Sequence, residues 1–367
     1  MKVPFVDLYK QYQSIKPDID AAIENTIKNS SYIGGQVVKE FETAFAEYLG
    51  LRHVIACGNG TDSIEILLQS FGVGKGDEVI VPAASWISTS EAVSAVGATP
   101  IFVDIEADYY TINPALIEAA ITSKTKAIIP VHLYGHPADM PAIMEIAKKH
   151  NLFVLEDCAQ SHGAMVNGKM VGTFGHAASF SFYPGKNLGA YGDAGAMATN
   201  DEKIAELARM IANHGQKGKH NHIMEGRNSR LDGLQAAILI AKIPHLPKWT
   251  AARIANAKIY DAHFENTGVT IPLIKQNYQH VYHLYVIRCN DRKEMQQRLE
   301  QAGIDTAVHY PTALPFLPCY ASRNHQSSDF PVAYKYQSQI LSIPMFAELT
   351  EAEIAFIAET VAQPSYA

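Results

Sequence analysis

Short apolar runs alternate with amphipathic stretches from about residue 51 to residue 200 of the chain. Five such runs are rich in Val, Ile, Leu and Phe, and they begin at His53, Glu78, Pro100, Ala127 and Leu152. A run without in/out alternation is typical of a strand buried on both faces, and strands connected by helices are usually parallel. Helices are predicted for 61–71, 88–96, 114–121 and 140–150. The pattern predicts an α/β sheet flanked by helices, with its chemistry at the strand ends.

The pattern changes in the last third of the chain. A helix is predicted over 229–241, and a long helical connector opens at Lys248. Residues 281–288 alternate between apolar and polar, as a half-buried strand does. Further helices are predicted at 291–302 and 350–362, and further strands at 305–310 and 341–343. Because 367 residues are too many for one compact core, we expect a large domain over 1–247 and a smaller α+β domain over 248–367.

Composition narrows the class of protein. Hydrophobic residues make up 47% and charged residues 18%, as in globular proteins, and the net charge of −7 argues against a general nucleic-acid binder. No apolar run approaches the length of a membrane span, and the N-terminus lacks the apolar core of a signal peptide. The four cysteines are widely separated, and His220 and His222 lack a suitably spaced partner. We therefore expect a cytoplasmic protein without membrane, nucleic-acid or metal partners.

Two stretches carry the strongest chemical signal. Lys186 lies in a Gly-rich turn after an apolar, Ser-bearing strand, and Asp157 ends an earlier strand, 29 positions upstream (186 − 157). A lysine so placed can hold an aldehyde cofactor covalently, and a carboxylate so placed can keep a pyridinium nitrogen protonated. Taken alone, either residue could be an ordinary loop or turn residue. Together they predict a cofactor that acts as an electron sink.

Five sequence blocks give the chain a family resemblance. They are 58–62 (GNGTD), 131–135 (VHLYG), 156–160 (EDCAQ), 181–189 (SFYPGKNLG) and 228–232 (NSRLD). With them the chain resembles the DegT/StrS-type nucleotide-sugar aminotransferases, from about Val3 to the last predicted helix. These are fold type I enzymes that use pyridoxal 5′-phosphate. The resemblance implies an α/β large domain with a mostly parallel central sheet flanked by helices, plus the smaller C-terminal α+β domain.

The resemblance also implies a cofactor site. Lys186 would be the catalytic residue, Asp157 would hold the ring nitrogen, Gln160 would lie near the ring's 3-oxygen, and Trp86 would stack on the ring. The phosphate would be bound by Gly60, Thr61, Asp62 and Ser181, and by Asn228 of the neighbouring subunit. From the residues alone, 58–62 could equally be a helix start that Thr61 or Asp62 caps, and Trp86 could be a core residue. Both alternatives stay open at this point.

Substrate contacts are expected in two places. The segment 213–230 is the most cationic part of the chain, and it could be a solvated loop. By resemblance, its Lys217, Lys219 and His220 would meet the diphosphate of a nucleotide-sugar. Contacts with the sugar would come from Tyr183, His309 and Tyr310. His132 is a further candidate, although a core histidine is as good an interpretation. The active site would then be shared between the subunits of a homodimer.

The activity that the resemblance implies is amino transfer from L-glutamate to a nucleotide-linked keto-sugar. The 131–140 segment looks most like that of members acting on a dTDP-3-oxo-6-deoxyhexose, which gives a dTDP-3-amino-3,6-dideoxyhexose. A 4-keto-sugar or a UDP-linked 3-keto-sugar is the alternative substrate. Lys186 argues against a dehydratase branch that has histidine at this position. A non-catalytic, pyridoxal-phosphate-binding regulatory protein is the alternative of another class.

Overall fold

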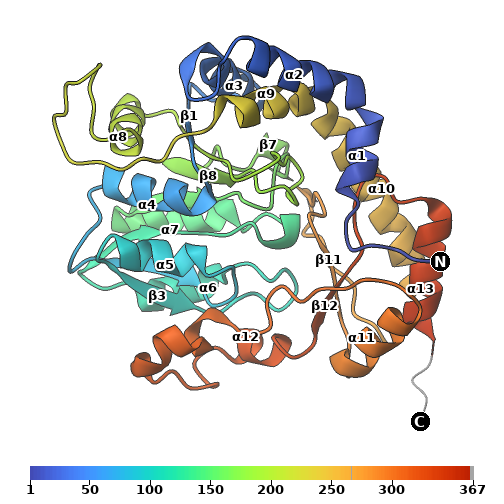
Figure 1. Cartoon of the computed structure of the whole chain (residues 1–367). Coiled ribbons are helices and arrows are strands. Elements are labelled where there is room, and N and C mark those ends of the chain that lie inside the picture. The colour runs from blue at the N-terminus through green and yellow to red at the C-terminus, as the bar shows by residue number, and fades with distance from the viewer. Residues whose placement is uncertain (266, 364–367) are drawn as a thin grey trace.

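A seven-stranded sheet forms the centre of the molecule (Figure 1). The computed structural model describes residues 1–265 and 267–363. The strand order is β1-β9-β8-β5-β4-β2-β3, and only β9 runs antiparallel to its neighbours. The strands are β1 (His53–Cys57), β2 (Glu78–Pro82), β3 (Thr99–Val103), β4 (Thr125–Ile128), β5 (Phe153–Asp157), β8 (Ala177–Ser181) and β9 (Gly195–Thr199). The predicted mostly parallel α/β sheet is confirmed.

Helices cover both faces of this sheet, which explains the uninterrupted apolar runs. In β1, Ile55 and Cys57 pack in the core cluster of one face, and Val54 and Ala56 pack in that of the other. The first face carries α4 (Gly60–Ser70), α5 (Ser88–Ala95) and α8 (Glu202–Ala212). The second face carries α3 (Gly35–Leu49), α6 (Pro114–Ile117), α7 (Met140–His150) and α9 (Gly233–Lys242). Most strand positions are therefore removed from water, whichever way their side chains point; Thr99 and Lys126 are exposed exceptions.

A second core lies beyond α10 (Leu246–Phe264). It contains the antiparallel pair β11 (Tyr285–Arg288) and β12 (Ile340–Ile343), with α11 (Arg292–Gln301) and α13 (Glu351–Ala362) packed on it. Val3 belongs to this core, and its N–H donates to the Gly303 carbonyl. The N-terminus consequently lies beside α13 (Figure 1). The division into domains at residues 247 and 248 stays a prediction.

Shorter elements complete the chain. The helices α1 (Leu8–Ser14) and α2 (Lys16–Lys28) lead from the N-terminus to α3, and α12 (Pro331–Tyr336) precedes β12. A small three-stranded sheet consists of β10 (Tyr278–Gln279), β6 (Met165–Val166) and β7 (Lys169–Met170). Among the described residues, no helix combines the length and the hydropathy that crossing a membrane requires.

Three predicted elements are wrong in whole or part. Residues 305–310 form no strand, because their backbone pairs with β12 only at Ala307. The strand predicted from 281 begins at Tyr285, since the N–H groups of Val281 and Leu284 donate instead to the carbonyls of Gly135 and Tyr134. The helix predicted from 229 begins at Gly233, since the Ser229 N–H donates to the Ala212 carbonyl. Tertiary partners of the backbone override the local pattern at all three places.

Candidate active site

Most of the predicted cofactor residues lie at one edge of the sheet. Asp157 is the last residue of β5, and Ser181 is the last residue of β8. Gly60 begins α4 shortly after β1, and Trp86 stands between β2 and α5. The carboxyl ends of parallel strands share an edge, so the topology brings these residues together from positions far apart in the sequence.

The turn that carries Lys186 is tightly held. The N–H of Lys186 donates to the Tyr183 carbonyl at 2.8 Å, and the next side chain, Asn187, donates to the Val281 carbonyl at 3.1 Å. A Cβ on Gly189 would lie 2.3 Å from the Pro184 carbonyl oxygen, so glycine is required for this fold of the turn. These contacts fix the backbone position from which the Lys186 side chain extends.

The electrostatic surroundings of Lys186 favour a reactive amine. Burial lowers the pKa of Lys186 to about 8 from its ordinary 10.5, and the Asp157 carboxylate opposes that shift. Burial also raises the pKa of Asp157, against hydrogen bonds from Ala159 and Thr89 and the charge of Lys186. The two residues thus act on each other electrostatically, and a larger fraction of the amine is neutral near pH 8 than for a solvated lysine.

Asp157 is buried, and each of its oxygens accepts a hydrogen bond. The Ala159 N–H donates to Oδ1 at 3.1 Å, and the Thr89 hydroxyl donates to Oδ2 at 3.0 Å. Thr89 in turn lies 2.8 Å from the Ser85 hydroxyl. A carboxylate oxygen has two lone pairs, so each oxygen retains room for a further donor such as a protonated ring nitrogen.

Gln160 connects this edge to the segments that carry Tyr134 and Tyr310. Its Oε1 accepts from the Tyr134 N–H at 2.7 Å, and its Nε2 donates to the Tyr310 hydroxyl at 3.1 Å. The Tyr134 hydroxyl donates to the His309 carbonyl. The ring of Trp86 is 56% exposed and lies 5.2 Å, between centroids, from that of Tyr310. The predicted ring contacts and the predicted sugar contacts are therefore neighbours.

The start of α4 departs from the expected cap. Asn59 is the capping residue, because its side chain accepts from the Asp62 N–H at 2.8 Å. Thr61 and Asp62, expected as possible caps, are inside the helix. The Thr61 hydroxyl lies 2.6 Å from that of Ser88. A Cβ on Gly60 would lie 2.8 Å from the Cβ of Ser181, so the absence of a side chain at Gly60 lets β8 approach the helix start.

The cationic segment 213–230 lies mostly on the surface of the single chain. Lys217 forms an ion pair with Glu206 at 2.5 Å, and Lys219 and His220 are exposed. Asn228 is also exposed, and its Oδ1 accepts from Arg230 Nε at 2.9 Å. Tyr183, next to the lysine turn, is 59% exposed. Among the described residues, no hydrogen bond or ion pair joins Lys217, Lys219 or His220 to Lys186, and their roles at the nucleotide diphosphate stay predictions.

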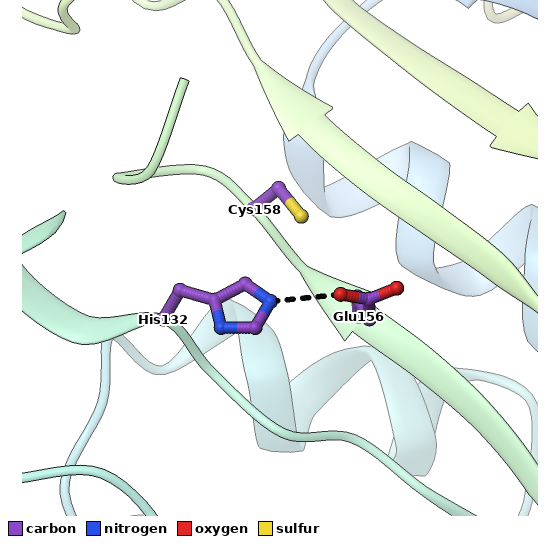
Figure 2. A group of neighbouring side chains, drawn as sticks. All are labelled: His132, Glu156 and Cys158. Carbon is purple, nitrogen blue, oxygen red and sulfur yellow. Dashed lines mark hydrogen bonds and ion pairs between the residues drawn. The ribbon is translucent and has the colours of Figure 1, made fainter. Parts of the chain in front are cut away.

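A group of three buried side chains has the composition of a metal site. The ligand atoms of His132, Glu156 and Cys158 lie within 4.8 Å of one another, and Figure 2 shows the ring of His132 directed at Glu156. His132 Nδ1 accepts from the Ala138 N–H at 3.0 Å, so the proton is on Nε2, which donates to Glu156 at 3.1 Å. Burial raises the pKa of the Cys158 thiol well above its usual range, which disfavours the thiolate that a metal needs.

Glu156 is already occupied by protein donors. Besides His132, the backbone N–H groups of Gly172, Phe174 and Gly175 donate to its carboxylate at 2.6–2.8 Å. The group therefore ties the 172–175 turn and the 131–138 segment to β5. His132, a candidate for the sugar pocket, is fully buried with both ring nitrogens satisfied, so the core interpretation holds for it.

The residues present fit pyridoxal phosphate. This cofactor requires an amine, a carboxylate for its ring nitrogen and donors for its phosphate. The amine with a lowered pKa and the buried Asp157 supply the first two. The N-terminal end of α4, where the helix dipole is positive, lies against Ser181 and suits an anion. Trp86 has an exposed ring beside these groups, so it is not the buried core residue considered above.

Two residues of the site were missed from the sequence. Thr89 contacts the Asp157 carboxylate, and the Tyr134 N–H orients Gln160. The hydroxyl-rich run of residues 85–90, which links a strand to a helix, could have indicated Thr89. Tyr134 has a positive φ of 60°, and nothing in its sequence neighbourhood signals that conformation.

Known protein families and relatives agree with this geometry. Residues 13–362 match the model of the DegT/DnrJ/EryC1/StrS aminotransferase family. The chain is 46% identical to a "pleiotropic regulatory protein" of Geobacillus stearothermophilus, over 99% of this chain and 98% of that protein. It is 43% identical to UDP-2-acetamido-2-deoxy-3-oxo-D-glucuronate aminotransferase of Pseudomonas aeruginosa, over 97% and 98%. It is 41% identical to dTDP-3-amino-3,6-dideoxy-alpha-D-galactopyranose transaminase of Aneurinibacillus thermoaerophilus, over 99% and 100%.

Solved structures show the same fold. DesV of S. venezuelae, crystallised with a ketimine intermediate, superposes with a TM-score of 0.96 at 40% identity and covers 98% of each chain. NtdA of Bacillus subtilis, solved with bound cofactor PMP, gives a TM-score of 0.91 at 32% identity over 98% of this chain and 84% of that one. The chain therefore belongs to the DegT/DnrJ/EryC1/StrS aminotransferase family, and it is a transaminase that depends on pyridoxal phosphate.

Proposed function

We propose that this chain transfers the amino group of L-glutamate to a dTDP-linked 3-oxo-6-deoxyhexose, giving a dTDP-3-amino-3,6-dideoxyhexose. The observation that carries the catalytic part is the pairing of Lys186, whose pKa burial lowers to about 8, with the buried Asp157 at one edge of the sheet. An amine that alternates between neutral and protonated forms near neutral pH is suited to moving protons.

The residues of the chain have separate roles in this reaction. Pyridoxal phosphate, when bound, supplies the electron sink and holds the amino group between donor and acceptor. Lys186 Nζ removes the proton from the donor's α-carbon and later returns one to the acceptor side. Asp157 keeps a proton on the ring nitrogen. Gly60, Thr61, Asp62 and Ser181 would hold the phosphate of the bound cofactor, Gln160 would face the ring's 3-oxygen, and Trp86 would stack on the ring.

The sugar assignment is supported by the relatives. The names of the Pseudomonas and Aneurinibacillus proteins refer to a 3-oxo and a 3-amino sugar, with UDP and dTDP respectively. Tyr310 contacts both Gln160 and Trp86, which supports it, with the adjacent His309, as a sugar contact. Tyr183 is the third proposed sugar contact. A UDP-linked 3-keto-sugar is the runner-up, and a 4-keto-sugar is the next alternative.

A homodimer with shared sites is part of the proposal. Asn228 would contact the phosphate bound by the partner, and Lys217, Lys219 and His220 would meet the nucleotide diphosphate. Their exposure in the single chain supports this, as do Ile223 and Met224, apolar residues of the same segment that are 54% and 38% exposed. We place the reaction in the cytoplasm, and the four cysteines, all free, are compatible with a reducing compartment.

An amination screen tests the substrate. The holoenzyme is incubated with glutamate and each of four acceptors, the 3-keto and 4-keto forms of a dTDP- and a UDP-hexose, and products are identified by mass spectrometry. We expect the dTDP-linked 3-keto-6-deoxyhexose to give the highest kcat/KM. A higher value for another acceptor would replace the sugar while leaving the transaminase assignment intact.

A regulatory role without catalysis is the second candidate, because the Geobacillus relative is named a regulatory protein. A protein of this kind would bind pyridoxal phosphate without turning over any donor. The retained Lys186, Asp157 and Gln160 favour catalysis.

A further inference from the structure

The hydroxyl of Thr89 is placed to act on Asp157. It donates to Oδ2 at 3.0 Å, while the backbone N–H of Ala159 donates to Oδ1 at 3.1 Å. Thr89 is 1% exposed and Asp157 is 5% exposed, so water does not compete for this contact. A hydrogen bond to a buried, ionised group is stronger than one between neutral groups.

The proton positions of this contact follow from Ser85. A hydroxyl has a single proton, and that of Thr89 is given to the carboxylate. The Ser85 hydroxyl, 2.8 Å from that of Thr89, must therefore donate to it. The hydrogen bonds then run from Ser85 to Thr89 to Asp157, and hydrogen bonds in such a chain polarise one another, which strengthens the last one.

The two hydroxyls of this relay, Ser85 and Thr89, lie in the segment that also carries Trp86. Thr89 lies in the first turn of α5, three positions after Trp86 (89 − 86). A helical threonine commonly donates to the carbonyl four residues before it, yet here the proton goes to a side chain on β5. The same segment thus carries Trp86, which is proposed to stack on the cofactor ring, and contacts Asp157, the proposed partner of the ring nitrogen.

We propose that Thr89, supported by Ser85, is a positioning residue that keeps Asp157 ionised and turned toward the ring nitrogen of the cofactor. The inference rests on the role proposed above for Asp157. Other groups that act electrostatically on this carboxyl are Lys186, His132, Cys158 and Tyr310. Thr89→Val removes the hydroxyl that donates to Asp157 with almost no change in the shape of the side chain.

The test compares Thr89→Val, which removes the donor, with Thr89→Ser, which keeps it. Thr360→Val is the matched control, because Thr360 is also buried and donates only to the Phe356 carbonyl in α13. Three quantities are measured: kcat, the pH titration of the bound cofactor's absorbance, and the pH at which the infrared band of a protonated buried carboxyl appears in the cofactor-free protein. Asp157→Asn identifies that band by removing it.

For Thr89→Val we expect a fall in kcat of about tenfold, and a carboxyl band that appears about one pH unit higher. The cofactor's titration should move with it, because a carboxyl that binds its proton more tightly is a weaker partner for the ring nitrogen. Thr89→Ser should restore the wild-type kcat and both titrations, and Thr360→Val should leave all three quantities unchanged. If Thr89→Val has the kcat and the titrations of the wild type, the inference is overturned. It is also overturned if Thr89→Ser is as impaired as Thr89→Val.

Two further variants separate the possible failures. If Thr89→Val does not fold, Ser85→Ala removes the second donor of the relay, and we expect a smaller shift in the same direction; no shift counts against the proposal. Asp157→Asn tests the underlying role. If it turns over normally, the role of Asp157 fails and the inference with it. If Asp157→Asn is inactive while Thr89→Val is normal, only the inference about Thr89 fails.

Discussion

Two features of its surroundings act on the amine of Lys186. Burial favours the neutral form and lowers the pKa to about 8, whereas the charge of Asp157 favours the ammonium. The sign is that of a buried lysine: the amine is protonated below about pH 8 and neutral above it. The residue is therefore poised between the two forms near the pH at which most proteins work.

This gives a pH-dependent prediction for cofactor capture. Only the neutral amine attacks an aldehyde, so the rate at which cofactor-free protein bonds to pyridoxal phosphate should rise about tenfold per pH unit below pH 8 and level off above it. Borohydride reduction followed by peptide mass mapping should find the cofactor on Lys186. Lys186→Ala should lose both the label and turnover, whereas Lys203→Ala, a change at an exposed lysine of α8, should lose neither.

Asp157 is expected to matter more for rate than for binding. Asp157→Asn keeps the size of the side chain but removes the charge, so kcat should fall roughly a hundredfold while the dissociation constant of the cofactor changes much less. Asp104→Asn is a matched control at another strand end, since Asp104 is buried and accepts from the N–H groups of Val332 and Ala333. Normal turnover with weak cofactor binding in Asp157→Asn would make Asp157 a structural contact only.

Helices and strands are predicted best from the sequence pattern where the local preference of the residues agrees with their tertiary contacts. The strands before Asp157 and Lys186 are apolar on both faces, and helices cover both faces. Residues 305–310 have the composition of a strand, but their backbone pairs with β12 at a single position. Residues 229–232 stay extended because the Ser229 N–H bonds to the Ala212 carbonyl. These partners come from distant parts of the chain, so no local pattern signals them.

The junction of α4 with β8 offers a test at this scale. Gly60→Ala would place a Cβ 2.8 Å from that of Ser181, and such overpacking costs about 1–3 kcal/mol. Because the strain falls at the proposed phosphate site, cofactor affinity should drop by roughly tenfold or more, with a smaller change in melting temperature. The control is Gly74→Ala, where the nearest atom to the new Cβ is 3.8 Å away. Equal cofactor affinity in both variants would show that the start of α4 does not bind the cofactor's phosphate.

For the whole molecule, a single chain assembles only part of the predicted site. Lys186, Asp157, Gln160, Trp86 and Ser181 gather at one sheet edge, as the order of strands and helices predicts. The residues of 213–230 remain on the surface, and Asn228 is occupied by Arg230 of its own chain. Their roles came from family resemblance, since no pattern within one chain can specify a contact with a second copy.

Complementation between two inactive chains tests the shared site. One chain carries Lys186→Ala, and the other carries Asn228→Asp, whose charge should repel the partner's phosphate. In a heterodimer with shared sites, one site receives both defects and the other receives neither, so activity should return to about half of wild type per dimer. If confirmed heterodimers of folded parents show no recovery, Asn228 acts within its own subunit.

The most direct test of the account is the first half of the reaction. Holoenzyme is mixed with L-glutamate in the absence of any sugar, and 2-oxoglutarate is counted per subunit. Because the amino group must rest on the cofactor until an acceptor arrives, we predict one equivalent of 2-oxoglutarate per Lys186-bound cofactor, and none from Lys186→Ala. A cofactor-loaded wild-type protein that forms no 2-oxoglutarate would contradict the proposed amino transfer from glutamate.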